Sequence, residues 1–229
     1  MTAPIACIAS MATRHILAEL SAAHAARTGR QVAVTSTGGV DAARRVEAGE
    51  PFDVVVLAAD ALARLDNAGA VRPGSRTDIA RSALAAAVAA DAPRPDLGSV
   101  EAAKRTLLAA SGIAYSTGPS GDHILALLRR WDIFGPLEGR LVKAPPGVPV
   151  GSLVADGKAQ IGFQQLSELS GLPGISIVGP LAAELQAVTV FSAGVGMRSG
   201  DPGAAGDFVA FLRDPATRQV YARHGMEMA

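Results

Sequence analysis

The 229-residue sequence predicts an α/β protein with two lobes, each a mostly parallel sheet flanked by helices, joined by two crossover strands that act as a hinge. Three observations predict this fold. Strand-like and helix-like segments alternate over residues 5–68, a double-proline break falls at 91–96, and a second extended stretch covers 186–194. We therefore expect a first lobe made of residues 1–82 and 192–229, and a second lobe made of residues 83–191.

Three strand–helix pairs predict the first lobe. The first helix has apolar residues at helical spacing, as at Ile16, Leu17 and Leu20, whereas Asp53–Ala58 is a continuous apolar run typical of a strand buried on both faces. Alternation of this kind builds a parallel sheet, because each helix returns the chain to the starting edge. The predicted strands are 5–9, 31–35 and 53–58, and the predicted helices are 15–28, 40–48 and 60–68.

The remaining segments continue this pattern with two ambiguities. Ser82–Ala89 is alanine-rich and compatible with a helix or a strand, and Gln164–Leu169 is expected to be a short helix or a helical turn. The predicted helices are 100–110, 121–131, 151–156, 204–213 and 215–224, and the predicted strands are 112–115, 140–142, 159–163 and 175–178. In this order the chain leaves the first lobe and returns to it.

The composition argues against several functions. Lys+Arg and Asp+Glu both number 21, so the chain has no net charge to attract nucleic acid or an anionic membrane. Aromatic residues make up only 4%, which leaves few surfaces for stacking bases or sugars. The four histidines show no metal-ligand spacing, and Cys7 lies in an apolar run without an activating group. We expect no metal, no cofactor and no nucleic-acid partner.

The sequence predicts no membrane segment. No stretch approaches the about 20 consecutive apolar residues that a membrane-spanning helix needs. Residues 2–10 lack the basic start and the long apolar run of a secretory signal. As written, the sequence predicts a cytoplasmic protein that does not insert into membranes, or a periplasmic one if an export signal has been removed.

Candidate binding residues lie where predicted strands end and helices begin. Open α/β sheets bind ligands at the carboxyl ends of their strands, and helix amino termini present free N–H groups and a positive dipole end to an anion. Residues of this kind suit ligand binding, and the hydroxyls and glycines among them also suit ordinary helix capping. The predicted ligand-binding residues are Ser10, Met11, Ala12, Thr13, Ser36, Thr37, Gly38, Gly39, Ser116, Thr117, Gly118, Ser120, Gly121, Val150, Gly151, Gln164 and Gln165.

Charged residues near these loops have two interpretations each. His123, in the first turn of a predicted helix, is either solvated or placed to move a proton near an anion. Glu168 is either a surface carboxylate or a base. Arg14 and His15 open the first helix, where Arg14 either binds a carboxylate or points to water. In a binding protein we expect no catalytic residue; in an enzyme, His123 and Glu168 are the candidates.

Five passages of the chain resemble the molybdate-binding proteins of ABC transporters and their soluble substrate-binding-domain relatives, within the type 2 periplasmic-binding superfamily. These passages are Gly38–Arg45, Phe52–Ala58, Tyr115–Gly121, Gly162–Leu169 and Val178–Leu181. The resemblance implies that an oxyanion lies between two lobes, held without a counter-cation by hydroxyls and backbone amides. By position it implies the following contacts: Ser10 and Ser36 from the first lobe, and Ser116–Ser120, Val150–Gly151 and the residues near Gln164 from the second.

Two functions from different classes follow. The first is a solute-binding protein that closes on a small anion, either an oxyanion or a small carboxylate, with an ABC permease as a partner if the protein is exported. The second is an isomerase on the same scaffold that moves a proton on a small polycarboxylate, since the resemblance also extends to a periplasmic-binding-like aconitate isomerase. Phe163-Gln164-Gln165 stands where the transporter proteins usually have a tyrosine, which favours a ligand other than molybdate.

Overall fold

The computed structural model describes residues 3–179 and 181–229. Residues 1, 2 and 180 lie outside the described part. Residue 180 is Pro180, which belongs to the passage at 178–181. The chain divides into two compact units, the first formed by the segment up to Ser82 with Val190–Ala229 and the second by Ala83–Thr189. Both divisions fall inside strands, β4 (Thr77–Ala89) and β9 (Val188–Val195). Two extended strands therefore carry the chain from one unit to the other.

A parallel three-stranded core forms the centre of the first unit. β1 (Ile5–Ser10) pairs in parallel with β2 (Val32–Thr37) on one side and with β3 (Val54–Ala58) on the other. β9 runs antiparallel to β3, and β10 (Glu227–Met228) runs antiparallel to the first part of β4. The three parallel strands end at one edge of the sheet, where the predicted binding residues of this unit lie.

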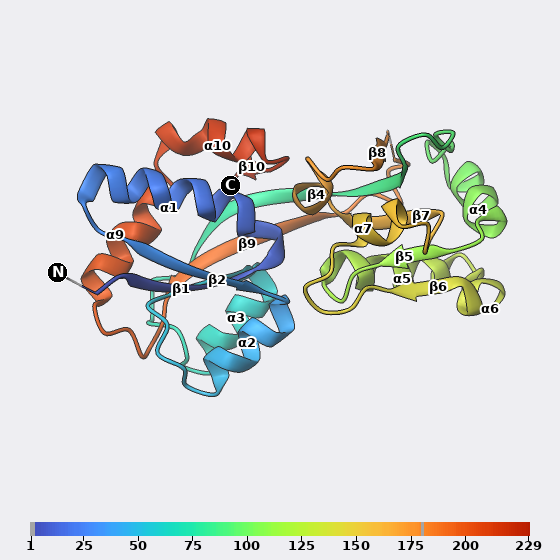
Figure 1. The fold of residues 1–229 in the computed structure, drawn as a ribbon. Coiled ribbons are helices and arrows are strands. Elements are labelled where there is room, and N and C mark those ends of the chain that lie inside the picture. The colour runs from blue at the N-terminus through green and yellow to red at the C-terminus, as the bar shows by residue number, and fades with distance from the viewer. Residues whose placement is uncertain (1–2, 180) are drawn as a thin grey trace. The chain divides into compact units, whose positions relative to one another are not determined.

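Helices cover both faces of this sheet (Figure 1). On one face lie α1, α9 and α10, which pack on Cys7 and Ala9 of β1, and on the other lie α2 and α3, which pack on Ile8. This division follows from the strand period of two, which sends successive side chains to opposite faces. The bounds are α1 (Arg14–Thr28), α2 (Gly39–Glu47), α3 (Ala59–Asn67), α9 (Pro202–Leu212) and α10 (Arg218–Arg223), with 3₁₀ turns at Met11–Thr13 and Pro215–Thr217.

Asp53 fixes the edge of the sheet where β3 begins. Its carboxylate accepts hydrogen bonds from the backbone N–H of Ala6 at 2.9 Å, from the Ser199 hydroxyl at 2.7 Å and from the Gly200 N–H at 3.0 Å. Burial opposes ionisation of this group, but the hydrogen bonds outweigh burial and lower the pKa of Asp53 below its ordinary value. The aspartate that opens the apolar run is thus a structural anchor, far along the strand from the predicted binding residues.

The second unit repeats the arrangement with shorter strands. β5 (Ile113–Tyr115) pairs in parallel with β6 (Leu141–Lys143) and β7 (Ile161–Gln165), and β7 then pairs antiparallel with the second part of β4. β8 (Ile175–Val178) also pairs antiparallel with β4. The helices are α4 (Val100–Ala109), α5 (Pro119–Arg130), α6 (Phe134–Leu137), α7 (Val150–Ala155) and α8 (Leu166–Leu169), with a 3₁₀ turn at Glu138–Arg140.

Apolar packing holds the second unit together. Trp131 and Phe163 are buried in one cluster with side chains of α4 and α5, and Phe134 packs against that cluster. Gly162 allows α7 to lie directly on β7, because a Cβ there would come within 2.5 Å of Val150 Cγ1. The start of α7 is therefore fixed by its contact with the sheet.

The two-lobed α/β prediction is confirmed, with two local outcomes. The ambiguous segment Ser82–Ala89 is a strand and belongs to β4. The prediction that Gln164 and Gln165 open the short helix is wrong, because both residues extend β7 and pair with Ala85 and Leu84 of β4. β4 continues its pairing with β7 beyond Phe163. The local sequence does not reveal this, because it depends on a distant strand.

The described residues contain no helix that is long and apolar enough to cross a membrane. Within the same residues, no three His, Cys, Asp or Glu side chains gather where they could hold a metal ion. Cys7 is fully buried, and burial raises the pKa of its thiol to about 12. A thiol with that pKa stays protonated at neutral pH and is a poor nucleophile.

Candidate functional site

In the first unit, the predicted residues meet at the carboxyl edge of the parallel strands. The register pairs Ser10 with Thr37 and Ala9 with Ser36, so the ends of β1 and β2 lie side by side. The start of α2 is equally close, since a Cβ built on Gly39 would lie 3.8 Å from Ser10 Cβ. Ser10, Ser36, Thr37 and Gly39 thus lie close together at this edge.

The Ser10 hydroxyl lacks a hydrogen-bond partner among the described residues. Ser10 is only 8% exposed, and its Oγ is buried. Its carbonyl oxygen is used locally, because the Thr13 hydroxyl donates to it at 3.0 Å. An unpartnered buried hydroxyl costs about 1–3 kcal/mol. The Ser21 hydroxyl in α1 is also unpartnered, but only Ser10 lies at the strand ends beside the start of α2. A ligand oxygen at this place would give the hydroxyl its missing partner.

The helices that begin at these loops start without a side-chain cap. Gly38 precedes α2 and Gly118 precedes α5, and neither can supply a side-chain acceptor. Two other α-helices, α4 and α9, have such a cap: the Ser99 hydroxyl accepts from Ala102 N–H at 3.2 Å, and Asp201 accepts from Ala204 N–H at 3.1 Å. No side-chain cap therefore takes the first-turn N–H groups of α2, whereas α5 offers fewer of them, because Pro119 has no N–H and the Gly121 N–H donates to the Gly118 carbonyl oxygen at 2.9 Å.

A second hydroxyl cluster forms at the start of α5 in the second unit. The Ser116 and Ser120 hydroxyl oxygens lie 2.9 Å apart, and the Gly118 N–H donates to Ser116 Oγ at 3.3 Å. Ser120 is buried, while Ser116 and Thr117 are half-buried. Gly121 packs so tightly beneath the loop that a Cβ on it would lie 1.9 Å from the Ser116 carbonyl oxygen. This glycine therefore sets the shape of the loop.

Thr37 and Val150 already have partners within the chain. The Thr37 hydroxyl donates to Asp41 at 3.1 Å, and the Val150 N–H donates to Gln164 Oε1 at 2.8 Å. The other end of the Gln164 amide donates to Glu168 at 2.8 Å. Gln164 thus ties the start of α7 to β7 and α8, and both ends of its amide are used.

Gln165 differs from its neighbour in having one free amide end. Its Nε2 donates to the Thr189 hydroxyl of β9 at 2.7 Å, whereas its Oε1 is buried without a partner among the described residues. Only 3% of Gln165 is exposed. Thr189 was not among the residues predicted from the sequence, because its contact with β7 depends on strands more than 20 residues apart.

The structure also places the two candidate catalytic residues. His123 Nε2 lies 3.1 Å from the Leu185 carbonyl oxygen, and a carbonyl can only accept, so this nitrogen carries the proton. The lone pair of His123 is then on Nδ1. Glu168 accepts the hydrogen bond from Gln164 and is half-buried. Each residue is held by the fold of the second unit, and neither is a freely solvated side chain.

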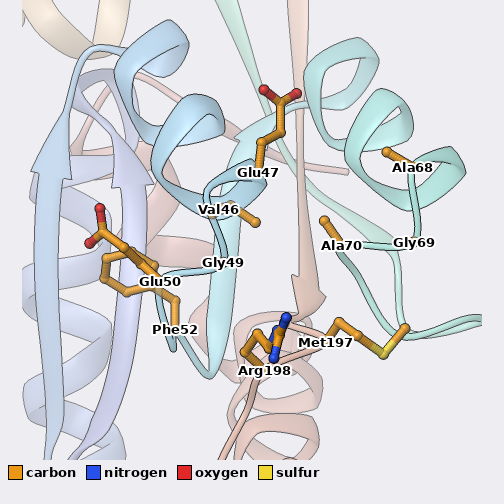
Figure 2. A pocket seen from close by; sticks show the side chains of 11 residues that line it. Val46, Glu47, Gly49, Glu50, Phe52, Ala68, Gly69, Ala70, Met197 and Arg198 are labelled. Carbon is orange, nitrogen blue, oxygen red and sulfur yellow. The ribbon is translucent and has the colours of Figure 1, made fainter.

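A cavity of about 410 Å³ lies elsewhere in the first unit. It opens where α2 and α3 end, beside the chain that follows β9, and Figure 2 shows Arg198 and Met197 on that segment. The strand ends that carry Ser10 and Ser36 do not line it. The carboxyl ends of two helices favour a cation, and Arg198 supplies one from within the chain. This cavity is therefore separate from the candidate anion site.

The fold and these loops define a class: an α/β protein with the type 2 periplasmic-binding, molybdate-binding-like fold. Residues 5–227 match the model of the bacterial extracellular solute-binding proteins, and the chain belongs to this family. The match spans both units and all the predicted binding residues.

Similar proteins include one relative by sequence and two solved structures of similar fold. An aconitate isomerase from Pseudomonas sp is 36% identical over 186 residues, which cover 80% of this chain and 70% of the relative. The periplasmic molybdate-binding protein of Azotobacter vinelandii has a TM-score of 0.81 at 21% identity, over 98% of this chain and 99% of the other. The sulfate-binding protein of Mycobacterium tuberculosis H37Rv has a TM-score of 0.79 at 19% identity, over 98% and 86%.

Proposed function

We propose that this chain binds a small anion, either an oxyanion or a small carboxylate. The observation that carries the proposal is the buried, unpartnered Ser10 hydroxyl next to the uncapped start of α2. In the second unit the uncapped start of α5, with Ser116 and Ser120, offers the complementary donors. The molybdate and sulfate binders among the structural neighbours are consistent with this chemistry.

The donors present are sufficient in energy for specific binding. A hydrogen bond to a charged group contributes about 1.5–3 kcal/mol, and a helix amino terminus adds about 0.3–1 kcal/mol. Three or four such contacts sum to about 5–12 kcal/mol before the cost of association is subtracted. No lysine or arginine is required at Ser10 itself, because the hydroxyl and the helix N–H groups solvate the charge.

Calorimetric titration of the chain with sulfate, molybdate, succinate and tricarballylate tests this proposal. We expect at least one of these anions to bind, and Ser10→Ala to weaken that binding about tenfold or more, since the variant lacks one charge-assisted contact. Ser21→Ala is the matched control, because Ser21 is also buried with an unpartnered hydroxyl but lies within α1, away from the strand ends. No heat with any of the four anions at millimolar concentration would contradict the proposal.

A second candidate function, isomerisation of an aconitate-like acid, is favoured by the 36% identity to the Pseudomonas enzyme. In this reaction a base removes a proton from the methylene group, the double bond shifts, and a proton is added to the former alkene carbon, so no atom is gained or lost. His123 Nδ1 and Glu168 are the candidate bases. Exchange of aconitate C–H hydrogens in deuterated water, lost in His123→Ala or Glu168→Ala, would establish this candidate. A wild-type protein that binds aconitate without exchange would leave binding alone as the function.

For location, the family description and the periplasmic Azotobacter relative favour the exported alternative over the cytoplasmic one. An ABC permease is then the expected partner, because a structural neighbour from Clostridium difficile is described as the substrate-binding domain of a putative molybdenum ABC transporter.

A further inference from the structure

Arg14 is a cation without an ion-pair partner among the described residues, next to the candidate site. It is the first residue of α1 and follows the turn that begins at Ser10. The amino terminus of a helix disfavours a positive charge, because the dipole already places partial positive charge there. Arg14 is exposed, and the helix end on which it lies does not compensate its positive charge.

His15 holds one end of the Arg14 side chain. Arg14 Nη2 lies 3.1 Å from His15 Nε2. Burial lowers the pKa of His15, and the nearby charges of Arg14 and His224 lower it further. The ring is therefore neutral at pH 7, and its Nε2 accepts a hydrogen bond from Arg14. This contact uses one of the five N–H groups of the guanidinium and leaves the others free.

The Glu19 carboxylate, on the same helix as Arg14 and His15, already has two partners. Glu19 accepts from His224 Nε2 at 2.9 Å and also pairs with Arg223. His224 in turn stacks on His15, with ring centroids 5.9 Å apart and an interplanar angle of 16°. Arg223 and His224, where α10 ends, thus take the Glu19 carboxylate, and Arg14 is left for an anion from outside the chain.

We propose that Arg14 is a second anion contact of the proposed site and selects a di- or tricarboxylate over a tetrahedral oxyanion. The inference rests on the proposed anion binding at Ser10. Since the Ser10 hydroxyl is buried and the Arg14 guanidinium is exposed, a ligand with two separate anionic groups meets both better than one small ion. The guanidinium fork matches a carboxylate with two parallel hydrogen bonds. His15 is a positioning residue, which orients the fork without contacting the ligand.

Titration of paired variants with tricarballylate and sulfate tests this inference. We expect Arg14→Gln to weaken tricarballylate binding about tenfold or more, because a bidentate charge-assisted contact is lost, and to change sulfate binding less than about twofold. Arg218→Gln is the control for net charge, since Arg218 is exposed at the start of α10 and forms no ion pair within the described residues. Its tricarballylate affinity should equal that of the wild type.

The ratio of tricarballylate affinity to sulfate affinity distinguishes a specific role of Arg14 and His15 from a general loss of binding. His15→Leu should weaken tricarballylate binding about threefold with sulfate unchanged, and His15→Gln, which keeps an acceptor, should retain more affinity than His15→Leu. Equal losses for both anions in Arg14→Gln, or no loss for either, would overturn the inference. A wild-type protein that binds sulfate but not tricarballylate would overturn it while leaving the proposed function intact. Binding of neither anion would overturn the inference, and it would overturn the proposed function as well if molybdate and succinate also fail to bind.

Discussion

Gly121→Ala is expected to weaken anion binding by about 100-fold or more. The added Cβ would lie 1.9 Å from the Ser116 carbonyl oxygen and 2.8 Å from its carbon, and both are backbone atoms that cannot rotate away. The loop must then move, which separates Ser116 from Ser120 and from the N–H groups at the start of α5. Losing two charge-assisted contacts corresponds to at least about 3 kcal/mol, or about 100-fold. Calorimetric titration with the anion bound best by the wild type measures this effect.

For the stability of Gly121→Ala, helix propensity and packing predict opposite changes in the free energy of unfolding. Alanine is favoured over glycine within a helix by about 1 kcal/mol, whereas overpacking costs about 1–3 kcal/mol. Gly206→Ala in α9 is the matched control, because nothing lies within 4 Å of its added Cβ, and it should stabilise the chain without affecting binding. Wild-type affinity in Gly121→Ala would show that the α5 loop does not contact the anion.

Gln164→Leu is expected to lower the free energy of unfolding by about 2–4 kcal/mol. The substitution keeps a similar volume but leaves the buried Val150 N–H without its acceptor and removes the hydrogen bond to Glu168. A buried unpaired N–H costs about 1–3 kcal/mol, and a lost contact to a charged group adds to that cost. Urea unfolding followed by circular dichroism measures the change.

The control for this variant is Gln219→Leu, an exposed glutamine on α10. A surface substitution of this kind changes stability by less than about 0.5 kcal/mol. If Gln164→Leu were as stable as Gln219→Leu, the amide of Gln164 would not be the link between α7, β7 and α8 that its two hydrogen bonds indicate.

The order of strands and helices is predictable from local patterns. Apolar runs such as Asp53–Ala58 and helical spacing such as that of Ile16, Leu17 and Leu20 depend on residues close in sequence. The structure has a strand in the first case, β3, and a helix in the second, α1. Strand ends with hydroxyls and glycines, as at Ser10 and Gly39, then indicate where a site can form.

The hydrogen-bonding state of each site residue could not be predicted in this way, because it depends on distant segments. Gln164 and Gln165 are adjacent and chemically identical, yet Gln164 is bonded at both ends of its amide, to Val150 and Glu168, whereas Gln165 is bonded at Nε2 to Thr189 and has no partner at Oε1 among the described residues. In the same way, the bond of His123 to Leu185 spans 62 positions. Sequence patterns located these side chains, and tertiary pairing decided which atoms remain free for a ligand.

Mapping of backbone amide shifts during titration tests the central claim most directly. The experiment records ¹H–¹⁵N spectra of the labelled chain with increasing tricarballylate or sulfate. The largest changes are expected at residues 10–14, 38–40 and 116–121, because these loops carry the donors of the proposed anion contacts. Shifts confined to the cavity around Arg198, with none at these three loops, would contradict the account.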